Sequence, residues 1–432
     1  MPRPPRSPWG FVPTLYFAEG VPYVLVNSVS VILYKRLGVT NAAIAFWTSL
    51  LYLPWVLKML WGPLVDGHAS KRAWILVTQL AMTVCLAALA TAIGLPCFFA
   101  ATLAVFTLAA LVSATHDIAA DGFYLLALDE RRQALFVGVR TLFYRAAMIF
   151  GSGLLVTLAG RLERGTGGVP RAWTAAFALA AALYGGLWLY HRAALPRPDA
   201  DRPAADPRGI GLGLAAGAGA HWRTVFGSWF GQPRIAAIVA FILLFRLGEA
   251  MLLKLASPFL LDSREAGGLG LTTAQVGVAY GTVGLGCLIL GGIAGGWLIA
   301  RFGLRRMLWP LALTLNIPHA AYLYLAHAQP GPALAYPLVA LEQLGYGLGS
   351  TAFMVYLMRV SRGEHRTSHF AIATGLMALG MMLPGMVSGA IQEAIGYRAF
   401  FLLVLALGLP GLAVLPLLPR LADAGSGDPV PR

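Results

Sequence analysis

Two aspartates four residues apart are the first feature of this sequence with evident chemistry. Asp117 and Asp121 lie in an otherwise apolar stretch, and their spacing places both carboxylates on one face of a helix. Two carboxylates that close repel each other when both are charged, and a nearby cation relieves the repulsion. Arg140 and Arg145, in the next apolar stretch, are the expected partners. Such a group can bind and release a proton near neutral pH. The alternative is a static salt-bridge network that joins two helices.

A third acid, Glu19, lies in the sequence Tyr16-Phe-Ala-Glu19-Gly-Val-Pro22. Gly20 and Pro22 loosen a helix and free backbone polar groups beside the carboxylate. Interrupted helices of this kind often line binding sites in membrane proteins. Glu19 is therefore the strongest single candidate for a functional carboxylate.

The composition identifies the elements that must position these residues. The chain has 432 residues, of which 58% are hydrophobic and only 12% are charged, whereas soluble proteins carry roughly 25% charged residues. The mean hydropathy of +0.71 agrees with a chain that crosses a membrane several times. The net charge of +14 would indicate nucleic acid in a soluble protein. In a membrane protein it is explained by basic cytoplasmic loops, so no nucleic-acid partner is predicted. The three cysteines lack the spacing of metal ligands, and no cofactor or metal is predicted.

The sequence contains about twelve apolar stretches of the roughly 20 residues that a membrane span needs. We predict an all-α integral membrane protein with twelve transmembrane helices in two pseudo-symmetric bundles of six. Most lysines and arginines fall in loops on the side of the termini, which places both termini in the cytoplasm. The predicted spans are 11–33, 43–65, 73–95, 98–126, 134–159, 172–191, 234–261, 274–300, 307–328, 332–358, 367–391 and 397–418.

A polar linker separates the two halves. The predicted parts are an N-terminal bundle (1–191), a cytoplasmic linker (192–233), a C-terminal bundle (234–418) and a cytoplasmic tail (419–432). Within the linker, Trp222, Val225, Phe226, Trp229 and Phe230 recur with helical spacing. This pattern predicts a short helix in the membrane interface, and a plain linker is the alternative.

Charged side chains inside a bilayer cost about 2.5–3.5 kcal/mol or more, so those that remain usually face a cavity and a partner. Five cations and five acids lie within the predicted spans and nearly balance. We expect protons to be carried among Glu19, Asp117, Asp121, Glu249 and Glu342. We expect a small-molecule substrate to be bound by Asn27, Lys58, Arg140, Tyr144, Arg145, Arg246, Lys254, Asn316, His319 and Gln343.

One loop motif occurs twice, with matched positions 234 residues apart. The first copy reads Gly62-Pro-Leu-Val-Asp66-Gly-His-Ala69-Ser-Lys71-Arg72, and the second reads Gly296-Trp-Leu-Ile-Ala300-Arg-Phe-Gly303-Leu-Arg305-Arg306. Duplicated halves that repeat about the membrane normal are a transporter architecture. The loop resembles the signature loop of the major facilitator superfamily.

The resemblance implies a gating role for this loop at the cytoplasmic side. It assigns that role to Asp66, and Ala300 cannot perform it. The gating set implied is Gly62, Asp66, Lys71, Arg72, Gly296, Arg305 and Arg306. The alternative is a basic turn that only sets the orientation of the chain.

Two further segments resemble the muropeptide permeases of the AmpG type and the wider peptide–acetyl-CoA–drug transporter family. They are residues 15–27 with 55–66, and Ser113–Leu128, in which Asp117 and Asp121 match the family's pair of aspartates. His116 and the run Gly122-Phe-Tyr124 depart from that pattern. The resemblance implies proton-driven uptake of an anionic sugar–peptide across the bacterial inner membrane by a monomer. Uptake of a siderophore or an oligosaccharide is the alternative.

Two functions of another class are considered. His116 and Asp121 fit the H-x4-D pattern of membrane acyltransferases, but residues five apart point to different sides of a helix. We therefore predict that the protein is not an enzyme. A non-transporting sensor on the same fold is the other alternative.

Overall fold

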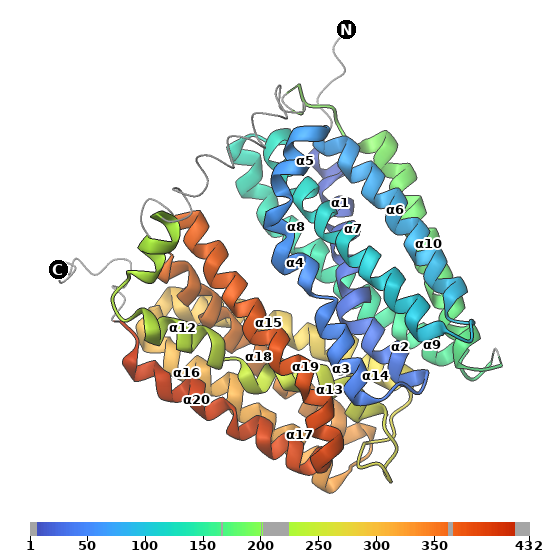
Figure 1. Ribbon diagram of the computed structural model, residues 1–432, viewed down its shortest axis with the longest axis vertical. Helices are drawn as coiled ribbons and strands as arrows, with labels where there is room; N and C mark the ends of the chain where they lie inside the picture. Colours follow the sequence, from blue (N-terminus) through green and yellow to red (C-terminus); the bar gives the residue numbers. More distant parts are fainter. Residues whose placement is uncertain (1–6, 166, 200, 202–223, 362–365, 420–432) are drawn as a thin grey trace. The chain divides into compact units, whose positions relative to one another are not determined.

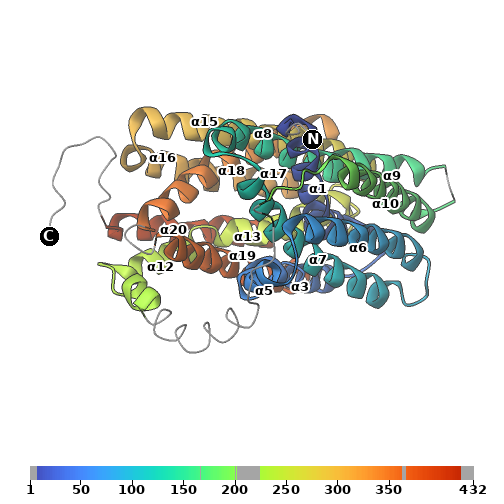
Figure 2. The same ribbon diagram turned by 90° about the horizontal axis from the view of Figure 1, so that it is seen from above.

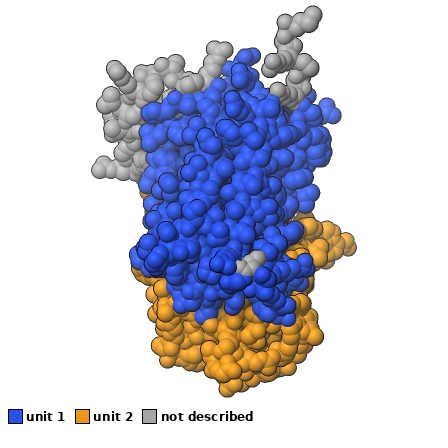
Figure 3. All heavy atoms as spheres, turned by 90° about the vertical axis from the view of Figure 1, so that its right-hand side faces the viewer, with its two compact units in different colours: residues 1–39, 47–214, 272–281 blue, residues 40–46, 215–271, 282–432 orange. Residues whose placement is uncertain are grey.

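The computed structural model describes residues 7–165, 167–199, 201, 224–361 and 366–419, and the regular secondary structure in these residues is helical. The chain divides into two compact units (Figure 3). Unit 1 holds residues 1–39, 47–214 and 272–281, and unit 2 holds residues 40–46, 215–271 and 282–432. Each unit is described by itself.

Unit 1 begins with α1 (Val12–Val24), which passes through a π-helical turn (Leu25–Val29) into α2 (Ser30–Arg36). Its long helices are α6 (Lys71–Ala92), α7 (Phe98–Ala127), α8 (Glu130–Ile149) and α10 (Val169–Ala194), and a second π-helical turn (Phe150–Leu155) joins α8 to α9 (Val156–Leu162). Helix α6 packs between α7 and α10, as both views show (Figures 1 and 2). Helix α1 packs against α7 and α8, which brings three predicted site helices together.

The second predicted span is not one continuous helix. It consists of α3 (Asn41–Leu50), α4 (Leu53–Leu57), a 3-10 turn (Lys58–Leu60) and α5 (Gly62–His68). Pro54 and Pro63 lie near the starts of α4 and α5, where a missing N–H costs little. The interruption places Lys58 in the 3-10 turn between two short helices.

Unit 2 contains a short helix at 224–230 followed by α12 (Ile235–Leu244), α13 (Leu247–Leu261) and α15 (Leu285–Phe302). Then come α16 (Leu304–Asn316), a 3-10 turn (Ile317–His319), α17 (Ala320–Ala328) and α18 (Pro332–Val360). The last described elements are α19 (Arg366–Ala406), α20 (Gly408–Val414) and a 3-10 turn (Leu415–Leu417). Helix α18 packs on α15 and α16, and α13 packs on α19. Gly396, at φ 76°, kinks α19 between its two predicted spans.

Of the predicted linker helix, Trp222 lies outside the described residues. In helix 224–230 the side chains of Val225 and Trp229 are buried, and Trp229 joins the hydrophobic core of unit 2. Phe226 and Phe230 stay exposed on the outside, with stacked rings whose centroids are 6.2 Å apart. The predicted single apolar face is therefore divided between the core and the surface.

Eight helices in the described residues are long and apolar enough to cross a membrane. Seven of them match single predicted spans, and the eighth, Ile372–Leu417, contains the last two. The remaining three predicted spans fall on interrupted or more polar helices. These are the second span, with the shorter apolar segment Asn41–Leu57, the α16–α17 segment broken at Ile317–His319, and α18, which carries Glu342.

The two copies of the signature loop differ in backbone conformation. Gly303 has φ 81°, a left-handed conformation that side chains disfavour, so the second copy keeps glycine. Ala69 has φ −154°, an extended conformation that any residue adopts, which explains why the first copy tolerates alanine. The side chain of Asp66 lies outside the described residues.

Each unit contains a short segment from the other half of the sequence. Residues 40–46 belong to unit 2, and residues 272–281 belong to unit 1. The repeat offset of 234 maps the first segment onto 274–280, so the two exchanged segments are equivalent. In unit 2, the Asn41 amide donates to Gln392 Oε1 at 2.6 Å and to the Tyr397 hydroxyl at 2.8 Å.

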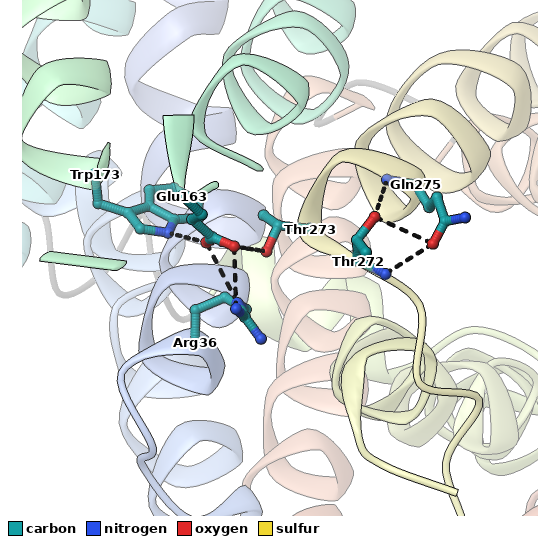
Figure 4. A network of polar contacts seen from close by, with 6 residues as sticks. All are labelled: Arg36, Glu163, Trp173, Thr272, Thr273 and Gln275. Carbon is teal, nitrogen blue, oxygen red and sulfur yellow. Dashed lines mark hydrogen bonds and ion pairs between the residues drawn. The ribbon is translucent and has the colours of Figure 1, made fainter. Parts of the chain in front are cut away.

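The matching contacts in unit 1 converge on Glu163 (Figure 4). Its carboxylate accepts from the guanidinium of Arg36 at 3.0 Å, the indole N–H of Trp173 at 3.1 Å and the hydroxyl of Thr273 at 2.8 Å. The neighbouring Thr272 forms a capping box with Gln275 at the start of α14 (Thr273–Val276). The exchanged segment is therefore held by charge-assisted hydrogen bonds.

We expect Gly281→Ala to destabilise unit 1, because a Cβ at Gly281 would overlap the backbone carbonyl of Ser152. Overpacking of this kind costs about 1–3 kcal/mol. The measurement is the thermal unfolding midpoint of the purified protein in detergent. Gly286→Ala is the matched control, because a Cβ at Gly286 meets no atom within 4 Å. Equal midpoints for the two variants would contradict the close packing at Gly281.

Candidate functional site

The first predicted ion pair is present in unit 1. Arg140 on α8 reaches Asp121 on α7, with 2.9 Å between a guanidinium nitrogen and Oδ1. The same carboxylate oxygen accepts a hydrogen bond from the hydroxyl of Tyr16 on α1 at 3.0 Å. The guanidinium also lies over the Tyr16 and Tyr124 rings, 4.5 and 5.2 Å from their centroids. Three helices therefore meet at Asp121: the sequence predicted the contact with Arg140, and it did not predict the contact with Tyr16.

Asp117, one turn earlier on α7, has a different cation. Lys58 Nζ lies 3.6 Å from its Oδ2. The sequence predicted Arg140 and Arg145 as partners for both aspartates, and in the structure Arg145 pairs with neither. Its guanidinium instead lies 3.6 Å from the sulfur of Met148 on the same helix. The second cation is Lys58 because the 3-10 turn at 58–60 brings the interrupted second span against α7.

Glu19 lies within the electrostatic field of this group. Its carboxylate is 8% exposed on α1 and interacts with the charges of Asp117, Asp121, Arg140 and Lys58. Among the described residues, the buried Oε2 atom has no hydrogen-bond partner and no cation forms an ion pair with Glu19. Glu19, Asp117, Asp121, Lys58 and Arg140 are named here the unit 1 charge cluster. It holds three acids and two cations, so one acid lacks a paired cation.

Two other predicted substrate-binding residues lie on or directly after helices that carry this cluster. Tyr144 on α8 interacts electrostatically with Glu19 and Asp117, and its ring lies 6.1 Å from that of Tyr23. Asn27 lies in the π-helical turn after α1, where its amide donates to the Tyr23 carbonyl at 3.0 Å. Turns of π-helix inside long helices often occur at functional sites.

Unit 2 contains a second polar group, centred on a buried ion pair. Arg246, just before α13, donates to both carboxylate oxygens of Glu249, at 2.9 and 2.5 Å. It also donates to the hydroxyl of Tyr346 on α18 at 2.8 Å. The Glu249 carboxylate is fully buried. Glu249, expected to carry a proton, and Arg246, expected to bind substrate, therefore neutralise each other as an i, i+3 pair.

Glu342 on α18 is 1% exposed and accepts a hydrogen bond from the neighbouring Gln343 at 2.9 Å. Its other oxygen, Oε1, has no hydrogen-bond partner among the described residues. Both ring nitrogens of the buried His319 also lack a hydrogen-bond partner among the described residues. Glu342 and His319, two predicted site residues, therefore lie in the interior of unit 2 with polar atoms that form no hydrogen bond to the described residues.

Asn316 and Lys254 are also in the interior of unit 2. The Asn316 amide donates to the Ala312 carbonyl at 2.9 Å, and its oxygen occupies the space that a Cβ at Gly408 would take. Asn316 therefore packs between α16 and α20. Lys254 is half-buried on α13.

A network of buried polar side chains in unit 1 was missed by the sequence analysis. The Gln79 amide lies 3.1 Å from His116 Nε2 and 3.0 Å from His191 Nδ1, and His191 Nε2 lies 2.9 Å from the Thr14 hydroxyl. Four helices contribute to it. Polar residues at Gln79 and His191 inside predicted spans were the available signal. His116 faces this network while Asp121 faces Arg140, which separates the two residues of the acyltransferase pattern.

The predicted gating residues lie at the ends of helices. The backbone N–H groups of Lys71 and Arg72 donate to the Asp201 carboxylate at 2.6 and 3.0 Å, at the start of α6. The guanidinium of Arg72 also donates to the Arg192 carbonyl at 2.7 Å. Arg305 and Arg306 are exposed at the start of α16. A Cβ at Gly62 or Gly296 would meet no atom within 4 Å, so close packing does not require these glycines.

A chain of apolar helices in two duplicated halves, with charged residues paired in its interior, defines a multi-pass membrane transporter rather than an enzyme. The family model of the Major Facilitator Superfamily matches residues 14–361 of this sequence and, in a second overlapping match, residues 243–431. The chain therefore belongs to the Major Facilitator Superfamily. This confirms the predicted fold class, an all-α membrane protein with the major facilitator fold.

Two similar proteins support the same assignment. The chain is 28% identical over 407 residues to the anhydromuropeptide permease of Escherichia coli K12, across 93% of this chain and 77% of the relative. It is 24% identical over 419 residues to the putative transporter AmpG 4 of Rickettsia conorii, across 93% of this chain and 94% of the relative. The predicted resemblance to AmpG-type permeases is confirmed.

Solved structures show the same fold at lower sequence identity. The nucleoside transporter NupG superposes with a TM-score of 0.67 at 16% identity, across 94% of this chain and 98% of that chain. A POT family transporter bound to 5-aminolevulinic acid superposes with a TM-score of 0.70 at 12% identity, across 94% and 95%.

Proposed function

We propose that this protein imports an anhydromuropeptide-like sugar–peptide across the bacterial inner membrane by alternating access, driven by protons. The observation that carries proton coupling is the unit 1 charge cluster, in which three acids share two cations. Each unpaired charge inside a membrane protein is costly. A proton on one carboxylate neutralises that acid, and the two remaining negative charges then equal the two positive charges of the cluster. The substrate class rests on the similarity to the anhydromuropeptide permease.

The predicted residues have different roles in this proposal. Lys58 and Arg140 hold Asp117 and Asp121 in place and attract an anionic substrate, while Glu19 carries the proton. Arg246 and Glu249 form a fixed pair in unit 2, and Glu342 and His319 offer polar atoms to the substrate. The two termini and the signature loops lie on the cytoplasmic side, where the loops control access to the site.

The test is uptake of a radiolabelled anhydromuropeptide into liposomes that contain the purified protein. We expect accumulation when the pH outside is lower than inside, and its loss when a protonophore collapses the gradient. Uptake that is unchanged by the protonophore would reject proton coupling. A competition series with a siderophore and an oligosaccharide compares the alternative substrates, and stronger inhibition by either than by the unlabelled anhydromuropeptide would reject the proposed substrate class.

A further inference from the structure

Four aromatic side chains from α1, α8 and the interrupted second span meet in unit 1. The Tyr23 ring lies 5.3 Å from Trp55, 6.1 Å from Tyr144 and 6.3 Å from Tyr52, between ring centroids. The Tyr52 and Trp55 rings are stacked, 6.2 Å apart and inclined by 26°. All four side chains are half-buried rather than enclosed. Tyr23, Tyr52, Trp55 and Tyr144 are named here the aromatic platform.

The local backbone explains why these rings converge. At Gly20 the backbones of α1 and α8 approach so closely that a Cβ would lie 2.9 Å from the Tyr144 carbonyl oxygen and 2.8 Å from Ala147 Cβ. Tyr23 follows Gly20 on α1 by about one turn, so its ring comes beside Tyr144. Tyr52 and Trp55 come from the interruption of the second span, where α3 ends and α4 begins.

The platform adjoins the unit 1 charge cluster. Glu19 precedes Tyr23 by four residues on α1, and Lys58 follows Trp55 by three residues. Lys58 is also the cation that pairs with Asp117, with 3.6 Å between Nζ and Oδ2. The side chains of Lys58 and Arg140 are 37% and 30% exposed. Charged groups within spans do not face lipid, so the open side of this group faces the polar interior.

Half-buried aromatic rings beside charged groups suit one kind of ligand. Rings of Tyr and Trp offer a flat apolar face together with a polar tip, and the C–H face of a pyranose ring packs on such a surface. Binding sites for small molecules commonly combine aromatic walls with a few placed polar groups. The three tyrosine hydroxyls at the ring edges can hydrogen-bond the hydroxyl groups of a sugar that packs on the ring faces.

We propose that the aromatic platform binds a pyranose ring of the transported molecule, with Lys58 beside it for an anionic group of the same sugar. This inference rests on the proposed function and adds Tyr23, Tyr52 and Trp55 to the site. It assigns the saccharide to unit 1 and leaves the peptide to other residues. Rings that serve only to pack helices together would not distinguish a sugar from a peptide.

Calorimetric titration of the purified protein tests the proposal with three probes. These are an anhydromuropeptide, its disaccharide without the peptide, and its peptide without the sugar. In Trp55→Leu and Tyr52→Leu we expect the affinity for the first two probes to fall by at least roughly tenfold, the size of loss expected for a central aromatic contact. We expect affinity for the free peptide to stay unchanged. Trp309→Leu, at a Trp 43% exposed in unit 2, is the control and should leave all three affinities unchanged.

The fitted number of sites reports the fraction of folded protein, so partial misfolding does not imitate lost affinity. If Trp55→Leu does not fold, Trp55→Tyr replaces it, and the ratio of disaccharide to peptide affinity is compared with that of the wild type. Equal losses for sugar and peptide, or no loss at all, would overturn the platform. Wild-type protein that binds only the peptide would overturn it while leaving the transport proposal standing. Disaccharide binding without gradient-driven uptake would support the platform and reject proton-coupled import.

Discussion

Glu19→Gln abolishes accumulation driven by a pH gradient but leaves substrate exchange intact, if Glu19 carries the coupled proton. Glutamine keeps the shape of the neutral acid and cannot release a proton. Glu19 is buried, and among the described residues it has no ion-pair partner, unlike Asp117 and Asp121. A carboxylate buried without a cation is costly, whereas its neutral form is far cheaper to bury. We expect uphill uptake to fall by at least about a hundredfold, because loss of a specific proton-transfer group commonly costs 10²–10⁴-fold.

Counterflow separates coupling from binding in this experiment. Liposomes loaded with unlabelled substrate should exchange it for labelled substrate at a rate near that of the wild type. Glu265→Gln, the same substitution at an exposed loop position, is the control and should retain full uptake. If Glu19→Gln retains more than half of the wild-type uphill uptake, another acid carries the coupled proton. Asp121→Asn and Asp117→Asn are then the next variants.

Arg246→Leu is expected to reduce the free energy of unfolding by about 3–5 kcal/mol, the cost of removing one partner from a buried ion pair. The variant leaves the fully buried Glu249 carboxylate without the guanidinium that now donates to both of its oxygens. The Tyr346 hydroxyl also loses the hydrogen bond that the Arg246 guanidinium donates. The double variant Arg246→Leu/Glu249→Leu removes both charges and should recover most of the stability, because apolar replacements of buried pairs are often neutral or stabilising.

Denaturant titrations in detergent micelles provide the measurement for this cycle. Arg132→Leu is the matched control, since Arg132 and Asp129 form an ion pair with the same spacing on the exposed end of α8. Exposed pairs contribute about 0–1 kcal/mol. A double variant that is as unstable as Arg246→Leu would contradict charge burial as the cause. Transport by a stable double variant would further show that Glu249 carries no coupled proton.

The sequence predicted the chemistry of single helices better than the pairing of residues between helices. The i, i+4 spacing of Asp117 and Asp121 and the i, i+3 spacing of Arg246 and Glu249 are properties of one helix. In the structure the two aspartates lie one turn apart on α7, where Asp121 pairs with Arg140, and Arg246 pairs with Glu249. Arg140 reaches its predicted partner, but Arg145 does not. A difference of five residues turns the helix by more than a full turn, so the two arginines point to different sides.

Sequence pattern predicted only Tyr144 of the aromatic platform, and it did not predict the histidine network. Tyr52 and Trp55 look like ordinary apolar residues of a span, and only the interruption between α3 and α4 brings them to Tyr23. Gln79, His116 and His191 come from three different helices, whose adjacency depends on packing. A neutral side chain such as Gln79 carries no charge that marks it within an apolar span, so its role depends on which helices pack around it.

The exchanged segments 40–46 and 272–281 give the molecule the connectivity of a domain-swapped dimer whose two chains have been fused. In such dimers each copy completes its partner with an identical element. Cutting this chain between residues 201 and 224 would therefore produce two fragments that are each incomplete. The first fragment would lack Thr273 as a donor to Glu163, and the second would lack Asn41 as a donor to Gln392 and Tyr397. Neither fragment contains all the residues of its own unit, so we expect co-expression of both to yield more folded protein than expression of either alone.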